Sequence, residues 1–222
     1  MSGEVIGYVW YSQRQHYKSI AYRSVDVGPD ERSAPEVIET MWEDKRGRQL
    51  LPRSAFPEKM FAVAEYGGAP KRHPNVFTNG FVMVSSKAAD VLRQFDLGAG
   101  ALYPVELFDK DRVTPVEGEF FYLTHGNSKD SFLPDKSPEA WNNYRDGSVW
   151  SPPPNPLDDQ LFYGPSALEG PDIWREERTY WGLMMSDRLV QALKKAGASR
   201  GWLLLRCPVA TASNGCDAGR AA

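Results

Sequence analysis

Apolar and polar positions alternate along the chain in short blocks that predict strands. The segment Val5–Tyr11 is apolar, aromatic and β-branched, which predicts a strand close to the start. Ser19–Val27 alternates more loosely and predicts a second strand. Further along, Glu119–Thr124 and Gln160–Tyr163 have the same character. The chain is therefore expected to contain several short strands.

The block between these first strands and the first glycine-rich stretch predicts a helix. Ser33 followed by Glu36 is a capping-box pattern, and Pro35 is tolerated in a first helical turn. The apolar positions then recur at helical spacing on one face: Val37, Ile38, Met41 and Trp42. We expect this helix to end before Gly47. Residues 52–80 carry several prolines and glycines, so they are expected to be loops around one short apolar piece, Met60–Ala64.

A pattern of strand, helix and strand occurs twice. In each copy an apolar strand leads into a serine that can cap a helix, which is Ser85 or Ser86 in the first copy and Ser186 in the second. A glycine suited to a left-handed helix end follows each helix, at Gly98 and Gly197, and a second apolar strand comes next. Two such units predict an α+β fold with helices packed on a mixed or antiparallel sheet.

The organisation expected from these patterns has three parts. Residues 1–75 supply N-terminal strands and a helix that pack with the rest, residues 76–210 hold the repeated unit, and residues 211–222 form a flexible tail. The proline string at 151–156 excludes a helix interior or a central strand. It is either a mobile loop or an ordered one, braced by nearby aromatic residues: Trp141, Tyr144 and Trp150.

Composition narrows the possible partners. The chain has 222 residues, 41% of them hydrophobic and 12% aromatic, with a formal net charge of −3. It shows no basic footprint for nucleic acid and no polybasic patch for a membrane. The N-terminus lacks a charged leader followed by an apolar run, so a cytoplasmic location is expected. Cys207 and Cys216 do not form a disulfide framework, and Cys207 is expected to be a buried small apolar residue.

No catalytic, metal-binding or cofactor-binding signature is present. The three histidines, His16, His73 and His125, lie far apart and have no metal-ligand spacing. His125 follows a predicted strand and is expected at the surface or in a loop. A competing hypothesis is an enzyme of unfamiliar type that uses His125 with Glu119 or Asp130. We predict no enzymatic activity, no metal and no cofactor.

Acidic and aromatic residues gather in segments that a partner protein would reach. Carboxylates cluster around the predicted first helix, after the proline string and near Glu106, Asp109 and Asp111. A solvated face is the preferred interpretation, ahead of a partner surface and of acid–base catalysis. Trp10, Trp181 and Trp202 lie in apolar runs and are expected in the core. Tryptophans in polar surroundings either brace loops or anchor an interface, and both interpretations stay open for Trp141, Trp150 and Trp174.

From Ala167 the sequence ALEGPDIWREERTYWGLMMSDRLVQALKKAG resembles the C-terminal signature of a family of immunity proteins from bacterial polymorphic-toxin systems. The matching residues are Leu168, Gly170, Asp172, Ile173, Trp174, Ser186, Asp187, Arg188, Leu189, Leu193 and Gly197. Gly170, Asp172, Trp174, Ser186 and Asp187 are structural residues of that motif. The resemblance implies a protein that is encoded beside a toxin, such as one delivered by contact-dependent or type VI secretion, and that protects the producing cell.

The function expected from the sequence is therefore binding and neutralisation of one cognate toxin by covering its functional surface. The toxin-binding residues expected are Glu36, Glu39, Glu43, Asp44, Trp141, Tyr144, Trp150, Asp158 and Asp159. Charge reversal at Glu39 and Glu43, or Trp150→Ala, is expected to weaken toxin binding far more than folding. An adaptor or chaperone that escorts an effector is the alternative. The sequence leaves open whether the chain is a monomer or a homodimer.

Overall fold

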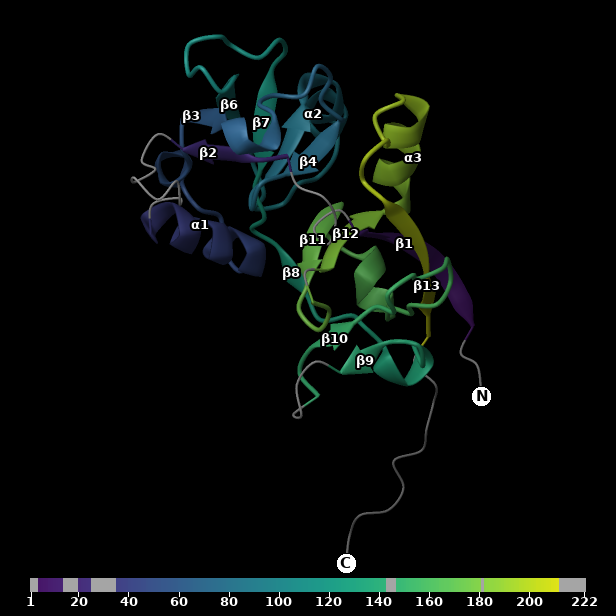
Figure 1. The fold of residues 1–222 in the computed structure, drawn as a ribbon. Coiled ribbons are helices and arrows are strands. Elements are labelled where there is room, and N and C mark those ends of the chain that lie inside the picture. Colours follow the sequence, from purple (N-terminus) through teal and green to yellow (C-terminus); the bar gives the residue numbers. More distant parts are fainter. Residues whose placement is uncertain (1–3, 14–19, 25–34, 143–146, 181, 212–222) are drawn as a thin grey trace, which may run out of the picture.

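The structure is a computed structural model with an α+β fold, described for residues 4–13, 20–24, 35–142, 147–180 and 182–211 (Figure 1). Outside these ranges lie the sequence predictions for His16, for both ends of the expected strand Ser19–Val27, for Ser33, Tyr144 and Trp181, and for the tail from residue 212 onward. Two sheets are joined through a pair of helices packed between them. The expected α+β class with helices on mixed or antiparallel sheets is confirmed.

The first sheet joins the N-terminal strand to the C-terminal part of the chain. Its strand order is β13-β1-β12-β11-β8. The strands are β1 (Val5–Ser12), β8 (Ser128–Lys129), β11 (Ile173–Glu176), β12 (Gly182–Ser186) and β13 (Leu204–Ala210). β1 is antiparallel to both β12 and β13, and the short edge strand β8 is parallel to β11. Strands from opposite ends of the sequence therefore lie side by side.

The second sheet uses the first half of the chain. Its order is β2-β3-β6-β7-β5-β4, with β3 parallel to β6 and the other neighbours antiparallel. The strands are β2 (Tyr22–Ser24), β3 (Lys59–Ala62), β4 (Val76–Thr78), β5 (Val82–Ser85), β6 (Leu102–Phe108) and β7 (Phe120–Leu123). β9 (Trp141–Asn142) and β10 (Trp150–Ser151) form a separate two-stranded ribbon. Residues 1–75 are thus divided between the two larger sheets.

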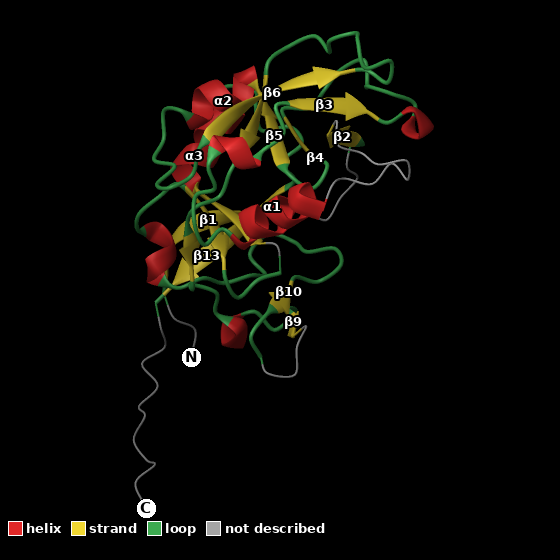
Figure 2. Ribbon diagram, turned by 90° about the vertical axis from the view of Figure 1, so that its left-hand side faces the viewer, coloured by secondary structure: helices red, strands yellow, loops and turns green. Residues whose placement is uncertain are grey.

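Three α-helices are described: α1 (Pro35–Arg46), α2 (Ser86–Leu92) and α3 (Asp187–Lys195). α1 ends before Gly47, as expected, and Gly47 has a φ of 64°. Short 3₁₀ turns occupy Arg53–Ala55, Ala64–Tyr66, Pro134–Lys136 and Pro165–Leu168. Figure 2 shows α1 between the region of the second sheet and the small ribbon of β9 and β10.

The two repeated units are confirmed as β5-α2-β6 and β12-α3-β13. Ser85 caps α2 by accepting a hydrogen bond from the Ala88 amide, and Ser186 caps α3 by accepting one from the Leu189 amide. In each unit the two strands are parallel but not adjacent, because one antiparallel strand lies between them. That strand is β7 in the first unit and β1 in the second. The repeat is therefore a split β-α-β arrangement.

Alternation along the strands buries both faces of the first sheet. Trp10 of β1 faces the core that α2 and α3 share, with Leu92, Leu193 and Trp202. The neighbouring residues Val9 and Tyr11 face a second core with Trp174, Met184 and Cys207. A third core lies under the second sheet and contains Val37 of α1 together with Phe77, Phe81 and Tyr122. Period-two alternation explains why β1 contributes to two cores at once.

Several local expectations differ from the structure. Residues 52–80 contain β4 as well as β3, because Val76–Thr78 is fully buried against β5. Gln160–Tyr163 forms only isolated bridges at Tyr163. On α1, Val37 is buried, whereas Ile38 and Trp42 are 39% and 46% exposed. No helix in the described ranges has the length and apolar character needed to cross a membrane.

Candidate functional site

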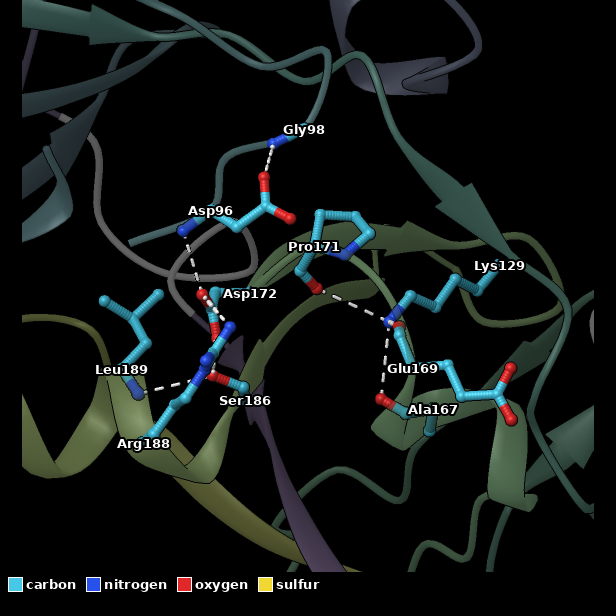
Figure 3. A network of polar contacts seen from close by, with 10 residues as sticks. All are labelled: Asp96, Gly98, Lys129, Ala167, Glu169, Pro171, Asp172, Ser186, Arg188 and Leu189. Carbon is cyan, nitrogen blue, oxygen red and sulfur yellow. Dashed lines mark hydrogen bonds and ion pairs between the residues drawn. The ribbon is translucent and has the colours of Figure 1, made fainter. Parts of the chain in front are cut away.

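Three polar residues of the C-terminal motif, Asp172, Ser186 and Arg188, form a hydrogen-bonded network with Asp96 (Figure 3). The Asp172 carboxylate is 1% exposed and accepts hydrogen bonds from the Ser186 hydroxyl at 2.5 Å and the Asp96 amide at 2.9 Å. It also accepts two from the Arg188 guanidinium, at 2.6 and 2.7 Å. Burial alone would raise the pKa of Asp172, but the hydrogen bonds from Arg188, Ser186 and Asp96 outweigh it and hold the pKa below its ordinary value.

The other motif residues are also used inside the molecule. The Asp187 carboxylate accepts a hydrogen bond from the Trp10 indole at 2.8 Å. Trp174 is 1% exposed, and the Lys129 ammonium lies 3.6 Å from the centre of its ring. The same ammonium donates to the carbonyls of Ala167, Glu169 and Pro171. Burial lowers the pKa of Lys129 to about 8.

This use of the motif decides one open question. Trp174 is a core residue under Lys129 and not an exposed anchor. Gly170 has a φ of 69° in the turn before β11. Motif residues thus hold the turn, the start of α3 and the loop at Asp96 in one arrangement. The buried motif residues form a framework, although Leu168 and Arg188 of the same motif are exposed.

A second group of polar side chains lies between the C-terminal end of α1 and β11. Asp44 is 2% exposed, and its carboxylate accepts a hydrogen bond from the His125 amide at 3.0 Å. The His125 Nδ1 atom lies 3.5 Å from the other oxygen of Asp44. Burial lowers the pKa of His125, the nearby Arg175 lowers it further, and Asp44 opposes both. His125 lies in the loop after β7, as one part of the expectation has it, but it is only 3% exposed, so the expectation of a surface histidine is wrong.

Arg175 belongs to the same group, and its side chain packs closely against the backbone of Gly47. It is 3% exposed, and burial lowers the pKa of its guanidinium to about 10, partly offset by Asp44. A Cβ at Gly47 would lie 2.4 Å from the Arg175 Cγ. Only glycine therefore fits at position 47, both for its positive φ and for the space that Arg175 occupies.

A pocket of about 470 Å³ opens beside this group. It is bounded by the C-terminal end of α1, by residues 148–149 before β10, and by the turn between β11 and β12. Figures 1 and 2 both show the end of α1 that carries Arg46 directed toward the sheet that contains β11. The residues that line it are Lys45, Arg46, Arg48, Ser148, Val149, Arg175, Glu176, Glu177, Arg178, Thr179, Tyr180 and Gly182.

The pocket carries more cationic than acidic side chains. Five of the lining residues are Lys or Arg and two are Glu. The Glu176 carboxylate accepts hydrogen bonds from the Ser131 amide at 3.0 Å and from the Ser131 hydroxyl at 2.5 Å. Burial raises the pKa of Glu176. Glu177 accepts a hydrogen bond from the Ser128 hydroxyl at 2.6 Å. Sequence reasoning missed this site, although the run Lys45–Arg48 was visible as a basic cluster.

The acidic residues expected to bind a toxin do not form one surface. Glu36 and Glu39 are exposed on α1, and Glu43 forms an ion pair with Arg46. Asp44 is buried beside His125, so it cannot belong to an exposed acidic surface. The Asp159 carboxylate pairs with Arg206 at 2.5 Å, and Asp158 accepts a hydrogen bond from the Arg206 amide. The structure therefore separates the acids of α1 from those that follow the proline string.

The expected aromatic residues also divide. Trp141 in β9 is 45% exposed and lines a pocket of about 350 Å³ with the proline string. Trp150 is half-buried, packs near Phe132 with ring centres 6.3 Å apart, and donates to the Gly147 carbonyl. Trp150→Ala would therefore disturb folding as well as any interface, contrary to the expectation from the sequence. Tyr144 lies outside the described residues.

The partners expected for His125 in an enzyme are different from those observed. His125 lies with Asp44 and Arg175, whereas Asp130 is exposed and contacts Arg178 at 3.9 Å. Glu119 precedes β7 at the edge of a separate pocket of about 680 Å³. Across the described ranges, no group of three or more His, Cys, Asp or Glu side chains is placed to hold a metal ion. Cys207 is buried as expected, and burial raises the pKa of its thiol.

Comparison with models of known protein families gives no match, and comparison with curated proteins gives none.

Proposed function

We propose that this chain is an immunity protein that binds one cognate bacterial toxin in the cytoplasm and neutralises it by covering its functional surface. The similarity of Ala167–Gly197 to an immunity-protein signature is the starting point of this proposal. The observation that carries it is the use of the motif residues. Asp172, Ser186 and Asp187 are engaged in internal hydrogen bonds that hold the scaffold.

A binding protein of this kind needs a rigid scaffold and a surface that can vary without loss of the fold. The buried networks around Asp172 and Glu176 supply the rigidity. Exposed large side chains supply candidate contacts, among them Trp42 and Trp141. Stable neutralisation requires an interface of about 1,600 Å² with a few buried aromatic or arginine anchors.

The proposal is tested by co-expression with the product of the adjacent reading frame. Rescue of growth, together with a stable complex in size-exclusion chromatography and inhibition of the toxin by the purified chain, supports an immunity protein. A stable complex without rescue or inhibition identifies an adaptor or chaperone instead. Absence of both a complex and rescue overturns the proposal.

Within the interface, Trp141→Ala is the sharpest variant. Trp141 is 45% exposed in a two-residue strand, so its removal is expected to leave the stability nearly unchanged. If it is an anchor, binding to the toxin weakens by about tenfold or more. Leu157→Ala is a matched control, because Leu157 is 66% exposed in the segment that follows the proline string.

A further inference from the structure

The framework role of the motif does not explain the cationic pocket at the end of α1. Its cations come from separate parts of the sequence. Lys45 and Arg46 end α1, and Arg48 follows it. Arg175 belongs to β11, and Arg178 lies in the turn after that strand. Lysine and arginine at the end of a helix favour the helix dipole, which accounts for Lys45 and Arg46. The helix dipole does not account for Arg48, Arg175 and Arg178, which line the same pocket.

Charged neighbours of the pocket do not remove its positive character. Arg46 pairs with Glu43, whose side chain is 37% exposed, and Arg178 lies 3.9 Å from Asp130, whose side chain is 62% exposed. Exposed ion pairs of this kind are weak because solvent screens them, so an incoming anion can compete for the arginines. Asp44 is buried near Arg175, whose charge it partly balances, and its carboxylate accepts a hydrogen bond from the His125 amide.

Crowding of like charges points in the same direction. Burial lowers the pKa of Lys45, and Arg175 lowers it further, against an opposing effect of Asp44. Two cations near each other are less unfavourable when an anion lies between them. A volume of about 470 Å³ is in the range of ligand pockets, and it is large enough for one or two acidic side chains.

We propose that this pocket receives a carboxylate-bearing segment of the partner protein, with one or two Asp or Glu side chains between Arg46, Arg48 and Arg178. This inference rests on the proposed function for the existence of a protein partner. It reverses the expectation from sequence, because the molecule offers a cationic recess to an acidic segment and not an acidic surface to a basic toxin. Arginine suits the role, since its planar guanidinium binds carboxylates through two hydrogen bonds.

The surroundings of the pocket favour an acidic peptide over a nucleic acid. The five cations of this pocket line a single recess, and Glu36 and Glu39 are exposed farther along the same helix. A phosphate backbone that continued past the recess would meet these carboxylates and the formal net charge of −3. Ile38 and Trp42, which are 39% and 46% exposed on α1, offer apolar contact to a peptide beside the recess.

The test measures binding of short probes to the purified full chain by calorimetry at low salt. The probes are acetyl-Glu₄-amide, acetyl-Gln₄-amide, inorganic phosphate and a ten-residue oligothymidylate. We expect saturable binding of the Glu peptide, little binding of the Gln peptide, and a Kd for the Glu peptide that rises with salt. The expected loss in the double variant Arg46→Glu, Arg48→Glu is about tenfold or more.

Matched variants make the result specific. The control Lys195→Glu, Arg200→Glu makes the same change of charge at exposed positions outside the pocket lining, and it should bind the Glu peptide as the wild type does. Arg46→Lys, Arg48→Lys keeps the charge but loses the paired guanidinium hydrogen bonds, so it should bind the Glu peptide more weakly than the wild type and more tightly than the Arg46→Glu, Arg48→Glu variant. Arg48→Glu alone should still weaken binding and leaves the Arg46–Glu43 pair intact.

Four outcomes overturn the inference: no saturable binding of the Glu peptide, an equal loss in the Lys195 and Arg200 control, tighter binding of the oligonucleotide than of the peptide, or equal affinity for phosphate alone. The proposed function is judged separately by growth rescue. Rescue by the wild type with unchanged rescue by the Arg46 and Arg48 variant would sink the pocket and leave the immunity role standing.

Discussion

Among the polar residues of the C-terminal motif, Asp172 is the one whose replacement is expected to be most damaging. The Asp172 carboxylate is 1% exposed and accepts four hydrogen bonds, two of them from Arg188. Because the Arg188 side chain is 67% exposed, its ion pair with Asp172 contributes only about 0–1 kcal/mol. The Ser186 hydroxyl and the Asp96 amide lose a charged acceptor, at about 1.5 kcal/mol or more each.

These contributions give an expected loss of about 3–4 kcal/mol in the free energy of unfolding for Asp172→Ala. Asp172→Asn keeps the volume but not the charge and should cost about 2 kcal/mol. Arg188→Ala should cost less than about 1 kcal/mol, because the guanidinium is mostly in solvent. Asp90→Ala is the matched control: Asp90 pairs with Arg93, but its side chain is 68% exposed, so little change is expected.

Urea unfolding followed by tryptophan fluorescence measures these differences, with the slope m checked for constancy. A loss below about 1 kcal/mol for Asp172→Ala, or an equal loss for Arg188→Ala, would refute the reasoning. The pH dependence gives a second check. Since the folded pKa of Asp172 lies below its ordinary value, the stability it adds is present above about pH 4 and is lost as the pH falls through the folded pKa. Asp172→Asn should lack this loss.

Three further predictions follow from other parts of the structure. Gly47→Ala should cost more than Gly170→Ala in a thermal melt, because both positions have positive φ but only at Gly47 does a Cβ meet Arg175, at 2.4 Å; equal costs would contradict the role of that contact. Burial lowers the pKa of His73 to about 4 and also lowers that of His125, so the stability they add should be complete above about pH 6.5 and should fall as the pH drops below it. The double variant His73→Gln, His125→Gln should flatten this fall in urea titrations at several pH values. An unchanged pH dependence in the double variant would be evidence against neutral histidines in the folded protein. Ser85→Ala should cost about 1 kcal/mol through loss of the α2 cap and of a hydrogen bond to the neutral Asn75 side chain. Ser186→Ala should cost about 2 kcal/mol because Ser186 caps α3 and donates to the buried, charged carboxylate of Asp172; the reverse order in urea unfolding would reject the network.

In the split β-α-β repeat, the local sequence predicts the helices and strands but not the order of the strands in the sheet. Ser85 and Ser186 mark both helix starts, because a serine hydroxyl satisfies a free backbone amide within three residues. The apolar blocks on either side predict the strands. Which strand lies between the two members of each unit is not a local property. β7 and β1 occupy these places through pairing over long sequence distances, and no pattern near Ser85 or Ser186 encodes it.

The candidate site divides in the same way. The sequence shows the acidic residues of α1 and the basic run Lys45–Arg48, but it does not show which of these side chains are buried. Asp44 is one residue from the exposed pair of Glu43 and Arg46, and helical rotation alone turns it inward to His125. Arg175 and Arg178 lie far along the chain and reach the same pocket only through the sheet.

What the sequence by itself determined is the α+β class, the two capped helices, the end of α1 at Gly47 and the buried state of Cys207, because each depends on residues that are close together in the chain. Tertiary structure alone decided that the motif at Asp172 is a framework and that the charged recess beside α1 is cationic. The physical reason is that burial and electrostatic potential depend on which distant groups come together. A side chain carries the same charge in the sequence whether it ends in solvent, like Glu39, or in the core, like Asp44.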